Sequence, residues 1–381
     1  MRMNQENKEK ALARIAAIAA GSSTNLSGGL FSGIEQMLAA GTSKVSAILC
    51  LTDGLMNHGI TDKPKLFSLL KAQLGAFPEG RTRPPVYCFG FGSDCDQDCL
   101  SSIASQTGGN FYSVLDLDGV SLAFADVLGG VMATTCQDIK LTCEVKLPAT
   151  FAADAMTKFP QKRQSPAVIE VTIKDLFAGE KRDVLFKLNV PKGGGASTVV
   201  VFDVNYLDVA LERRASAHAE LVVARCPGSA LPAGSVMDLD VGRNLARIQA
   251  VEEMARAKEL ASHGNYEDGR RVMREAVAKT RAMMSDLHVA EDEDAMMREM
   301  VQDLSSVESN MVSAEQWHSK GASTTAQYMD GQSNQRSNKL YNMSAMEAQS
   351  ASLAMAAPTS VYQTKSANTF MKKAASVFLK P

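Results

Sequence analysis

The sequence predicts an α/β domain at the N-terminus, followed by an antiparallel β region and then a helical module. Three observations support this order. Helical and strand patterns alternate over residues 1–135, apolar residues recur with a period of two over 137–230, and the helical period returns over 238–312. At 381 residues the chain is long enough for two or three domains, each with a core of its own.

The first region alternates helical patterns with apolar strand patterns. Residues 11–20 carry apolar side chains at helical spacing, and residues 30–38 continue as a helix from a polar loop. Residues 45–51 form a short apolar run, which is typical of a parallel strand buried on both faces. The rest of the region predicts a Rossmann-like parallel sheet, with helices over 64–74, 98–106 and 120–128 and strands over 86–91 and 111–115.

The second region alternates apolar and polar residues in short runs over 141–147, 169–173, 184–190 and 199–204. Turn sequences that contain glycine separate these runs. This period is typical of half-buried strands, so we expect an antiparallel β-sandwich or sheet.

The third region has an apolar stripe at helical spacing, interrupted at Gly264, and resembles a helical hairpin followed by a third helix. Beyond Ser319 the chain is rich in Ser, Asn, Gln, Gly and Ala, so we expect residues 319–381 to be mostly disordered. Within that tail, residues 370–380 form a short basic amphipathic segment that would suit a membrane surface or a partner groove.

Composition limits the class of protein. Hydrophobic residues make up 45% and charged residues 22% of the chain, and the net charge is −2. These values are ordinary for a globular protein and give no general attraction to nucleic acid. No apolar run approaches the ~20 residues of a membrane-spanning helix. Seven cysteines without a disulfide framework indicate reduced thiols and a cytoplasmic location.

Two polar loops carry the candidate chemistry. One contains Thr24 and opens a helix, and the other contains Asp53 and follows the apolar strand over 45–51. Ligands of open α/β sheets bind beyond the carboxyl ends of the strands. We therefore expect Thr24 and Asp53 to meet there as oxygen ligands for a hard cation such as Mg²⁺.

These loops resemble two of the three loops of the metal-dependent adhesion site in a von Willebrand factor type A domain. The order of the regions is similar to that of plant-type proteins with this domain, which also carry a RING finger and act as ubiquitin ligases. The phrase Asp-Leu-Phe-Ala-Gly-Glu-Lys-Arg-Asp-Val-Leu-Phe over 175–186 is similar to their sandwich. The resemblance implies that Thr24 and Asp53 ligate the metal, and that its open position takes a partner's exposed carboxylate. The loop around the partner would comprise Ser22, Ser23, Asn25 and Gly54.

The chain departs from the family pattern in two ways. The first strand and the Asp-x-Ser-x-Ser loop that follows it are not found upstream of Gly21, and no Cys/His cluster has RING spacing. Without the first strand, residues 46–51 become a naked sheet edge, which proteins usually avoid. Three alternatives follow: the chain is a fragment, a partner or second copy completes the domain, or the helix over 1–20 and other elements cover the gap.

The expected function is therefore protein interaction without enzymatic activity. The five histidines are dispersed, and none lies near a Ser or Cys in a nucleophile setting. The alternative is a subunit or fragment of a ubiquitin ligase whose RING finger lies upstream or on a partner. A third possibility, a secreted matrix or adhesion component, would require a signal peptide and paired cysteines.

Overall fold

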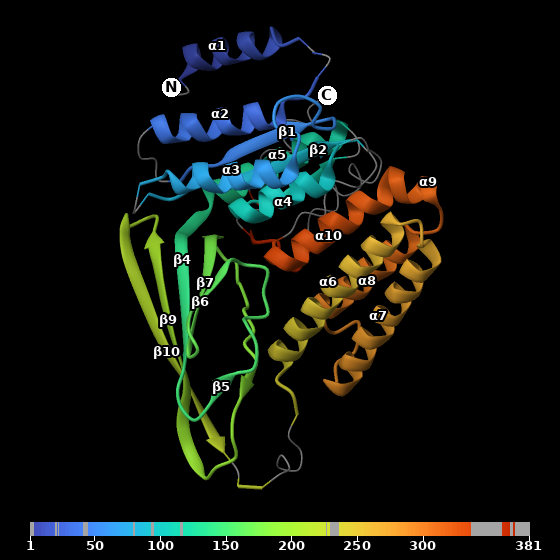
Figure 1. The fold of residues 1–381 in the computed structure, drawn as a ribbon. Helices are drawn as coiled ribbons and strands as arrows, with labels where there is room; N and C mark the ends of the chain where they lie inside the picture. The colour runs from blue at the N-terminus through green and yellow to red at the C-terminus, as the bar shows by residue number, and fades with distance from the viewer. Residues whose placement is uncertain are drawn as a thin grey trace.

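The structure is a computed structural model that describes residues 4–19, 21, 23–40, 45–78, 81–92, 95–114, 117–225, 227–228, 236–336, 360–365 and 369. Figure 1 shows three parts. A layer of helices around a short sheet lies at the top, a tall antiparallel sheet descends from it on one side, and a helical bundle lies on the other. Helix α10 (Ala322–Asn334) runs beneath the first part, toward the junction of all three.

The first part is the predicted parallel α/β layer. Strands β1 (Ile48–Thr52), β2 (Val86–Phe91) and β3 (Phe111–Val114) pair in parallel in the order β1-β2-β3. One face packs on helices α2 (Leu26–Ala39), α3 (Lys63–Gly75) and α4 (Gln97–Thr107), and the other packs on α5 (Leu117–Met132). Alternate β2 residues face the two cores, which explains why the whole strand is apolar.

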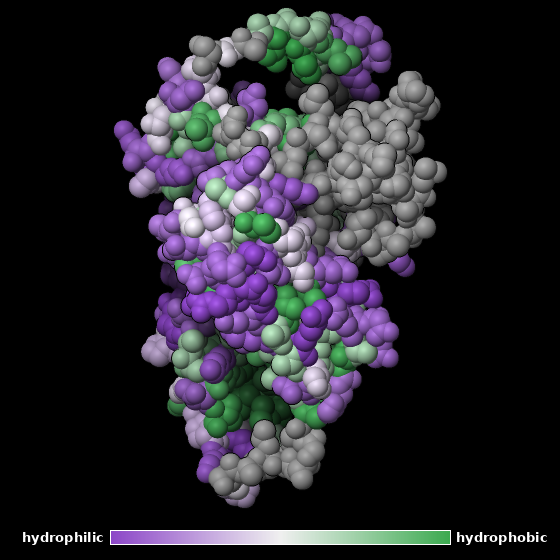
Figure 2. Space-filling view, turned by 90° about the vertical axis from the view of Figure 1, so that its right-hand side faces the viewer, coloured by the Kyte–Doolittle hydropathy of each residue, from purple (hydrophilic) through white to green (hydrophobic). Residues whose placement is uncertain are grey.

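Strand β1 is an edge of this sheet within the described residues. Whereas β2 is almost wholly buried, three residues of β1 are only half-buried and Leu51 is 47% exposed. Helix α1 (Gln5–Ala16) buries none of its residues. Its apolar face is open, with Leu12 65% and Ile15 63% exposed, and hydrophobic surface shows over this helix at the top of Figure 2. The alternative in which this helix covers the strand edge is therefore wrong.

The second part is one five-stranded antiparallel sheet with a small ribbon on one face. The strands lie in the order β10-β9-β4-β7-β6, and β5 and β8 pair separately. Phe151 and Phe186 from the ribbon side pack on Cys143 and Val200 of the large sheet, which closes the core. The strands are β4 (Thr134–Val145), β5 (Thr150–Phe151), β6 (Gln161–Ser165), β7 (Val168–Phe177), β8 (Leu188–Asn189), β9 (Gly195–Asp208) and β10 (Arg213–Arg225).

The β-sandwich prediction is thus correct only in part, because the segment over 184–190 contributes little more than β8. The reason lies just before that segment. The backbone N–H of Asp183 donates to Gln335 Oε1 at 2.8 Å, and Gln335 Nε2 donates to the carbonyl of Asp183 at 2.8 Å. The backbone N–H and carbonyl of Asp183 are therefore bonded to the side chain of Gln335, at the end of α10, instead of to a neighbouring strand.

The third part is a helical bundle. Helices α6 (Leu239–Ser262) and α7 (Tyr266–Asp286) form the expected hairpin, with Gly264 at a positive φ of 82° in the turn. Helix α8 (Ala295–Ser309) packs on them through a core rich in methionine and alanine. The bundle continues past residue 312 through α9 (Ala314–Gln316), a π-helix (Trp317–Gly321) and α10. Among the described helices, none has the length and apolar character needed to span a bilayer.

The prediction of disorder beyond Ser319 is wrong for residues 322–336. Helix α10 is buried on much of its surface although it is rich in Ser, Thr, Gln and Asn. Several of its polar side chains have partners: Thr325 Oγ1 donates to the carbonyl of Gly321 at 2.7 Å, and Gln332 Nε2 donates to Asp303 Oδ2 at 2.8 Å, whereas the buried Thr324 hydroxyl has no partner in the structure. The polar composition therefore belongs to a packed helix whose side chains mostly bond to neighbouring elements. The segment 370–380 lies outside the described residues.

Polar contacts connect the bundle with the α/β part, among them a hydrogen bond of 3.2 Å from Asn334 Nδ2 to Asn110 Oδ1. Asp330 Oδ2 accepts a hydrogen bond of 3.0 Å from the backbone N–H of Phe111 at the start of β3. Lys258 on α6 forms an ion pair with Asp98 at the start of α4. Because Ala326 of α10 also belongs to the core between the sheet and α2 to α4, the two parts share a packed interface.

Replacing Gly109 by alanine should destabilise the protein by about 1–3 kcal/mol, the range for overpacking a core. A Cβ at this position would lie 2.0 Å from the carbonyl oxygen of Val86, and both are backbone positions that cannot rotate away. Urea denaturation of the purified protein measures the change. The matched control is Gly29→Ala in α2, where an added Cβ meets nothing within 4 Å. That change should be stabilising by up to ~1 kcal/mol through helix propensity, and equal effects at the two sites would contradict the argument.

Candidate functional site

The two polar loops predicted from the sequence lie against each other beyond the carboxyl end of β1. The backbone N–H of Thr24 donates to Asn57 Oδ1 at 2.6 Å, and the N–H groups of Asn57 and His58 donate to the Thr24 carbonyl at 3.3 and 3.2 Å. A Cβ built on Gly54 would lie 3.3 Å from Thr24 Oγ1. The Thr24 hydroxyl therefore sits next to the residue that follows Asp53, as the strand-end argument predicts.

Asp53 is exposed at this edge. The buried hydroxyl of Thr52 holds the turn, because it accepts from the N–H of Gly54 at 3.4 Å and donates to the Gly54 carbonyl at 3.3 Å. Among the described residues, the Asp53 carboxylate has no hydrogen-bond or ion-pair partner. Its oxygens are free to take a ligand from solution.

The other predicted loop residues have different roles. Asn25 is the N-cap of α2: its Oδ1 accepts from the N–H of Gly28 at 2.8 Å and from the Ser27 hydroxyl at 3.2 Å. This oxygen caps the helix, while the residue itself stays exposed, so the place of Asn25 in a partner-binding loop remains a prediction. Ser23 is exposed and Gly54 is half-buried, so both remain at the surface of the site. Ser22 lies outside the described residues.

Ser27 is a residue of this site that sequence reasoning missed. It is buried, and its hydroxyl accepts from the backbone N–H of Ile60 at 2.8 Å. This bond ties the first turn of α2 to the loop that follows Asp53. The available signal was a serine in the first turn of a helix that begins in a candidate ligand loop.

The donor set suits a hydrated hard cation. Thr24 supplies a hydroxyl oxygen and Asp53 a carboxylate oxygen, which are ligands that Mg²⁺ accepts while it keeps several waters. Within the described part of the chain, no cluster of three or more His, Cys, Asp or Glu side chains could hold a metal ion. Thr24 and Asp53 are thus the two residues of these loops that could offer oxygens to a cation, and water or a partner would have to fill the other coordination positions.

A buried ion-pair network lies at the opposite end of the α/β layer. Arg336 Nη2 donates to Asp175 Oδ1 at 2.7 Å, and Arg336 Nε donates to Glu180 Oε1 at 2.8 Å. Arg182 Nη2 donates to Glu180 Oε2 at 2.9 Å. Burial alone would raise the pKa of the Glu180 carboxyl, but Arg336 and Arg182 together lower this pKa to about 2. The network joins β7, the loop after it and the end of α10.

Comparison with known proteins gives likenesses at low identity. No family model matches the chain. The chain is 26% identical over 216 residues to the pig (Sus scrofa) inter-alpha-trypsin inhibitor heavy chain H1; the match includes 55% of this chain and spans only 22% of that relative.

Two solved structures are similar in fold. A von Willebrand factor type A protein from Catenulispora acidiphila matches with a TM-score of 0.58 and 15% identity, over 81% of this chain and 68% of that chain. The ArnB paralog VWA2 from Sulfolobus acidocaldarius matches with a TM-score of 0.48 and 16% identity, over 83% of this chain and 72% of that chain. The parallel sheet flanked by helices on both faces and the likeness to the Catenulispora structure show that this chain contains a domain with the von Willebrand factor type A fold.

Proposed function

We propose that the protein is a non-enzymatic interaction module that binds an exposed carboxylate of a partner protein through a cation at Thr24 and Asp53. Domains of this fold are usually protein-interaction modules, which supports the general role. The observation that carries the specific proposal is the adjacency of the two loops at the end of β1, with the Thr24 hydroxyl beside Gly54. The carboxyl edge of a parallel sheet is the usual place for a ligand.

The chemistry is a bridge between two carboxylates. Asp53 alone would repel an acidic partner, but a divalent cation on Asp53 reverses the local charge. A partner carboxylate then replaces one of the waters on the ion. The Thr24 hydroxyl orients the ion, and the three backbone hydrogen bonds around Thr24 keep this hydroxyl in place.

The remaining parts of the chain would support this edge. The ion-pair network and the bond from the Phe111 N–H to Asp330 attach the antiparallel sheet and α10 to the α/β layer, and Lys258 of α6 pairs with Asp98. The Asp53 side chain stays exposed beside these contacts. Six cysteines in the described part are free thiols, which supports placing the protein in the reducing cytoplasm.

Replacing Asp53 by alanine should abolish the rise in melting temperature that Mg²⁺ causes in the unmodified protein. At a Mg²⁺ concentration ten times the dissociation constant, binding stabilises the folded state by ~1.4 kcal/mol. The measurement is a thermal melt at constant ionic strength with and without MgCl₂. Thr24→Val, which keeps the shape of the side chain but removes its hydroxyl, should reduce the rise.

The matched control is Glu35→Ala, which removes one exposed carboxylate from α2, away from the two loops. This variant should respond to Mg²⁺ like the unmodified protein. An unchanged Mg²⁺ response in the Asp53 variant would mean that the ion binds elsewhere, and the proposed site would be rejected.

A further inference from the structure

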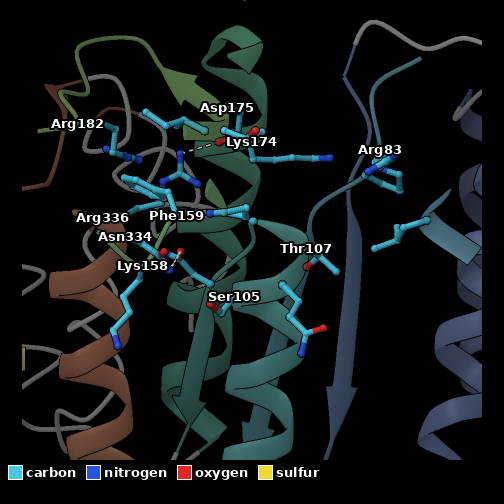
Figure 3. Close-up of a pocket in the computed structure, with 18 residues that line it drawn as sticks. Arg83, Ser105, Thr107, Lys158, Phe159, Lys174, Asp175, Arg182, Asn334 and Arg336 are labelled. Atoms are coloured by element: carbon cyan, nitrogen blue, oxygen red, sulfur yellow. Dashed lines mark hydrogen bonds and ion pairs between the residues drawn. The ribbon is translucent and has the colours of Figure 1, made fainter. Parts of the chain in front are cut away.

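A cavity of about 240 Å³ lies where the three parts of the molecule meet (Figure 3). The end of α4 and the loop before β2 line it from the α/β layer, β7 and the loop before β6 line it from the antiparallel sheet, and the end of α10 closes it. Its lining includes five basic side chains and one acidic side chain. These are Arg83, Lys158, Lys174, Arg182 and Arg336, and Asp175.

Two of the five cations are neutralised within the protein. Arg336 pairs with Asp175 and Glu180, and Arg182 pairs with Glu180. The other three, which are Arg83, Lys158 and Lys174, have no hydrogen-bond or ion-pair partner among the described residues. The cavity therefore carries an excess of positive charge that the protein does not balance.

Lys174 is the most informative of these cations. Its aliphatic stem packs against Gly108, where an added Cβ would lie 2.5 Å from Lys174 Cβ, and its ammonium extends toward Arg83 in Figure 3. Burial lowers the pKa of Lys174 to about 8; Asp175 and Asp138 oppose this shift and Arg83 adds to it. A desolvated ammonium beside a guanidinium is unfavourable unless an anion accompanies it.

Asn110 provides a second and independent sign of a ligand. It lines the same cavity and is 1% exposed. Its Oδ1 accepts from Asn334 Nδ2 at 3.2 Å, but its own Nδ2 has no acceptor in the structure. Most buried side-chain donors have a partner, so an orphaned amide in a cationic cavity points to a missing acceptor.

The C-terminus of α4, which lines the cavity, repels an anion there only weakly. A helix C-terminus carries partial negative charge on its last carbonyl groups. Here the carbonyls are occupied: the Thr107 hydroxyl donates to the Ile103 carbonyl at 2.9 Å, and the N–H of Gly109 donates to the Ala104 carbonyl at 2.9 Å. The unpaired side-chain cations therefore dominate the potential in the cavity.

We propose that this cavity binds a small anion of the phosphate class, with Lys174 and Arg83 as its charged ligands and Asn110 Nδ2 as a neutral donor. The volume is just below the ~300–1,000 Å³ of typical ligand pockets, which limits the occupant to a small group. The source is either free phosphate or the phosphoryl group of a monoester. Because Arg83 and Asn110 belong to the α/β layer and Lys174 to β7, the bound anion joins the two parts across their interface. This site is separate from the Asp53 edge.

The test measures phosphate binding to the full chain by calorimetry and by thermal melts, with chloride at equal ionic strength as the reference. We expect inorganic phosphate to bind and to raise the melting temperature. Lys174→Met should weaken binding by about tenfold or more, the loss expected for a charge-assisted hydrogen bond. It should also raise the melting temperature without phosphate, because it removes a half-buried charge that has no ion-pair partner among the described residues.

Arg83→Gln should weaken phosphate binding without any risk to folding, since Arg83 is exposed. The control is Lys162→Met on β6, which removes an exposed lysine outside the cavity and should leave binding unchanged. Phenyl phosphate distinguishes the sources: binding as tight as that of phosphate identifies a phosphoryl group on a larger molecule, and exclusion identifies the free anion. The proposal is overturned if neither anion binds, or if the Lys174 and Arg83 variants bind as tightly as the unmodified protein.

Discussion

Replacing Arg336 by methionine should lower the free energy of unfolding by about 3–5 kcal/mol, the usual result of removing one partner from a buried ion-pair network. The guanidinium of Arg336 is buried, bonds to both Asp175 and Glu180, and stacks 3.7 Å above the ring centroid of Phe177. Methionine fills much of the same volume but leaves the two carboxylates without their main counter-charge. Urea denaturation followed by circular dichroism measures the loss.

The control for this change is Arg271→Met on α7. Arg271 forms an exposed ion pair with Asp268, and exposed pairs contribute only ~0.2–1 kcal/mol. Adding Asp175→Asn and Glu180→Gln to Arg336→Met should recover part of the loss, since the stranded charges are then removed. The network would be shown to be unimportant if the Arg336 variant lost no more stability than the Arg271 variant.

The same network should contribute to the loss of stability at acid pH. The pKa of the Glu180 carboxyl is lowered from 4.5 to about 2 in the folded protein. A carboxyl whose pKa is lower in the folded state stabilises the protein above the unfolded pKa, and this contribution is lost as the pH falls from about 4.5 toward 2. Acid unfolding of the unmodified protein should therefore steepen in that window.

Replacing Asp330 by asparagine should stabilise the protein at pH 8 and remove a decline in stability between pH 4 and 7. Burial is the largest influence on Asp330 and raises its carboxyl pKa from 3.8 to about 7, although the Phe111 N–H, Arg336 and Asn334 favour the ionised form. The folded state therefore holds a proton that the unfolded state has released. Stability from this group is complete below about pH 4 and is lost as the pH rises through 7, by ~4 kcal/mol at most.

Asparagine retains an oxygen that accepts from the Phe111 N–H but carries no charge, so its contribution does not change with pH. Urea denaturation at pH 4 to 8 distinguishes the two proteins. Asp286→Asn, an exposed aspartate near the end of α7, is the matched control and should follow the unmodified protein. A parallel decline in the Asp330 variant would assign the pH dependence to other groups.

The α/β layer could be predicted from the sequence because a strand that is buried on both faces is apolar along its whole length. Strand β2 lies between two helical layers, and every one of its residues is apolar or glycine. The meeting of the Thr24 and Asp53 loops was also predictable, since the carboxyl ends of parallel strands share one edge. Both inferences depend only on residues near each other in sequence and on a general rule of topology.

The rest was not predictable because it depends on contacts between distant residues. In α10, Asp330 pairs with Phe111, and Gln332 pairs with Asp303. A local pattern of Ser, Gln and Asn reports polarity but not the presence of a partner, so this helix resembled a disordered tail. The same holds for Lys174, which occupies a polar position of an alternating strand and is half-buried, with Gly108 lying against its stem.

The position of α10 has a consequence for the order in which the protein can fold during synthesis. The α/β layer is translated before the antiparallel sheet and the bundle, but one residue of its core, Ala326, and the acceptor for the N–H of Phe111 are supplied by a helix about two hundred residues later. Domains usually fold one after another as they leave the ribosome. Here the α/β layer lacks part of its core until α10 has been made, so its surface for α10 remains uncovered while the antiparallel sheet and the rest of the bundle are translated.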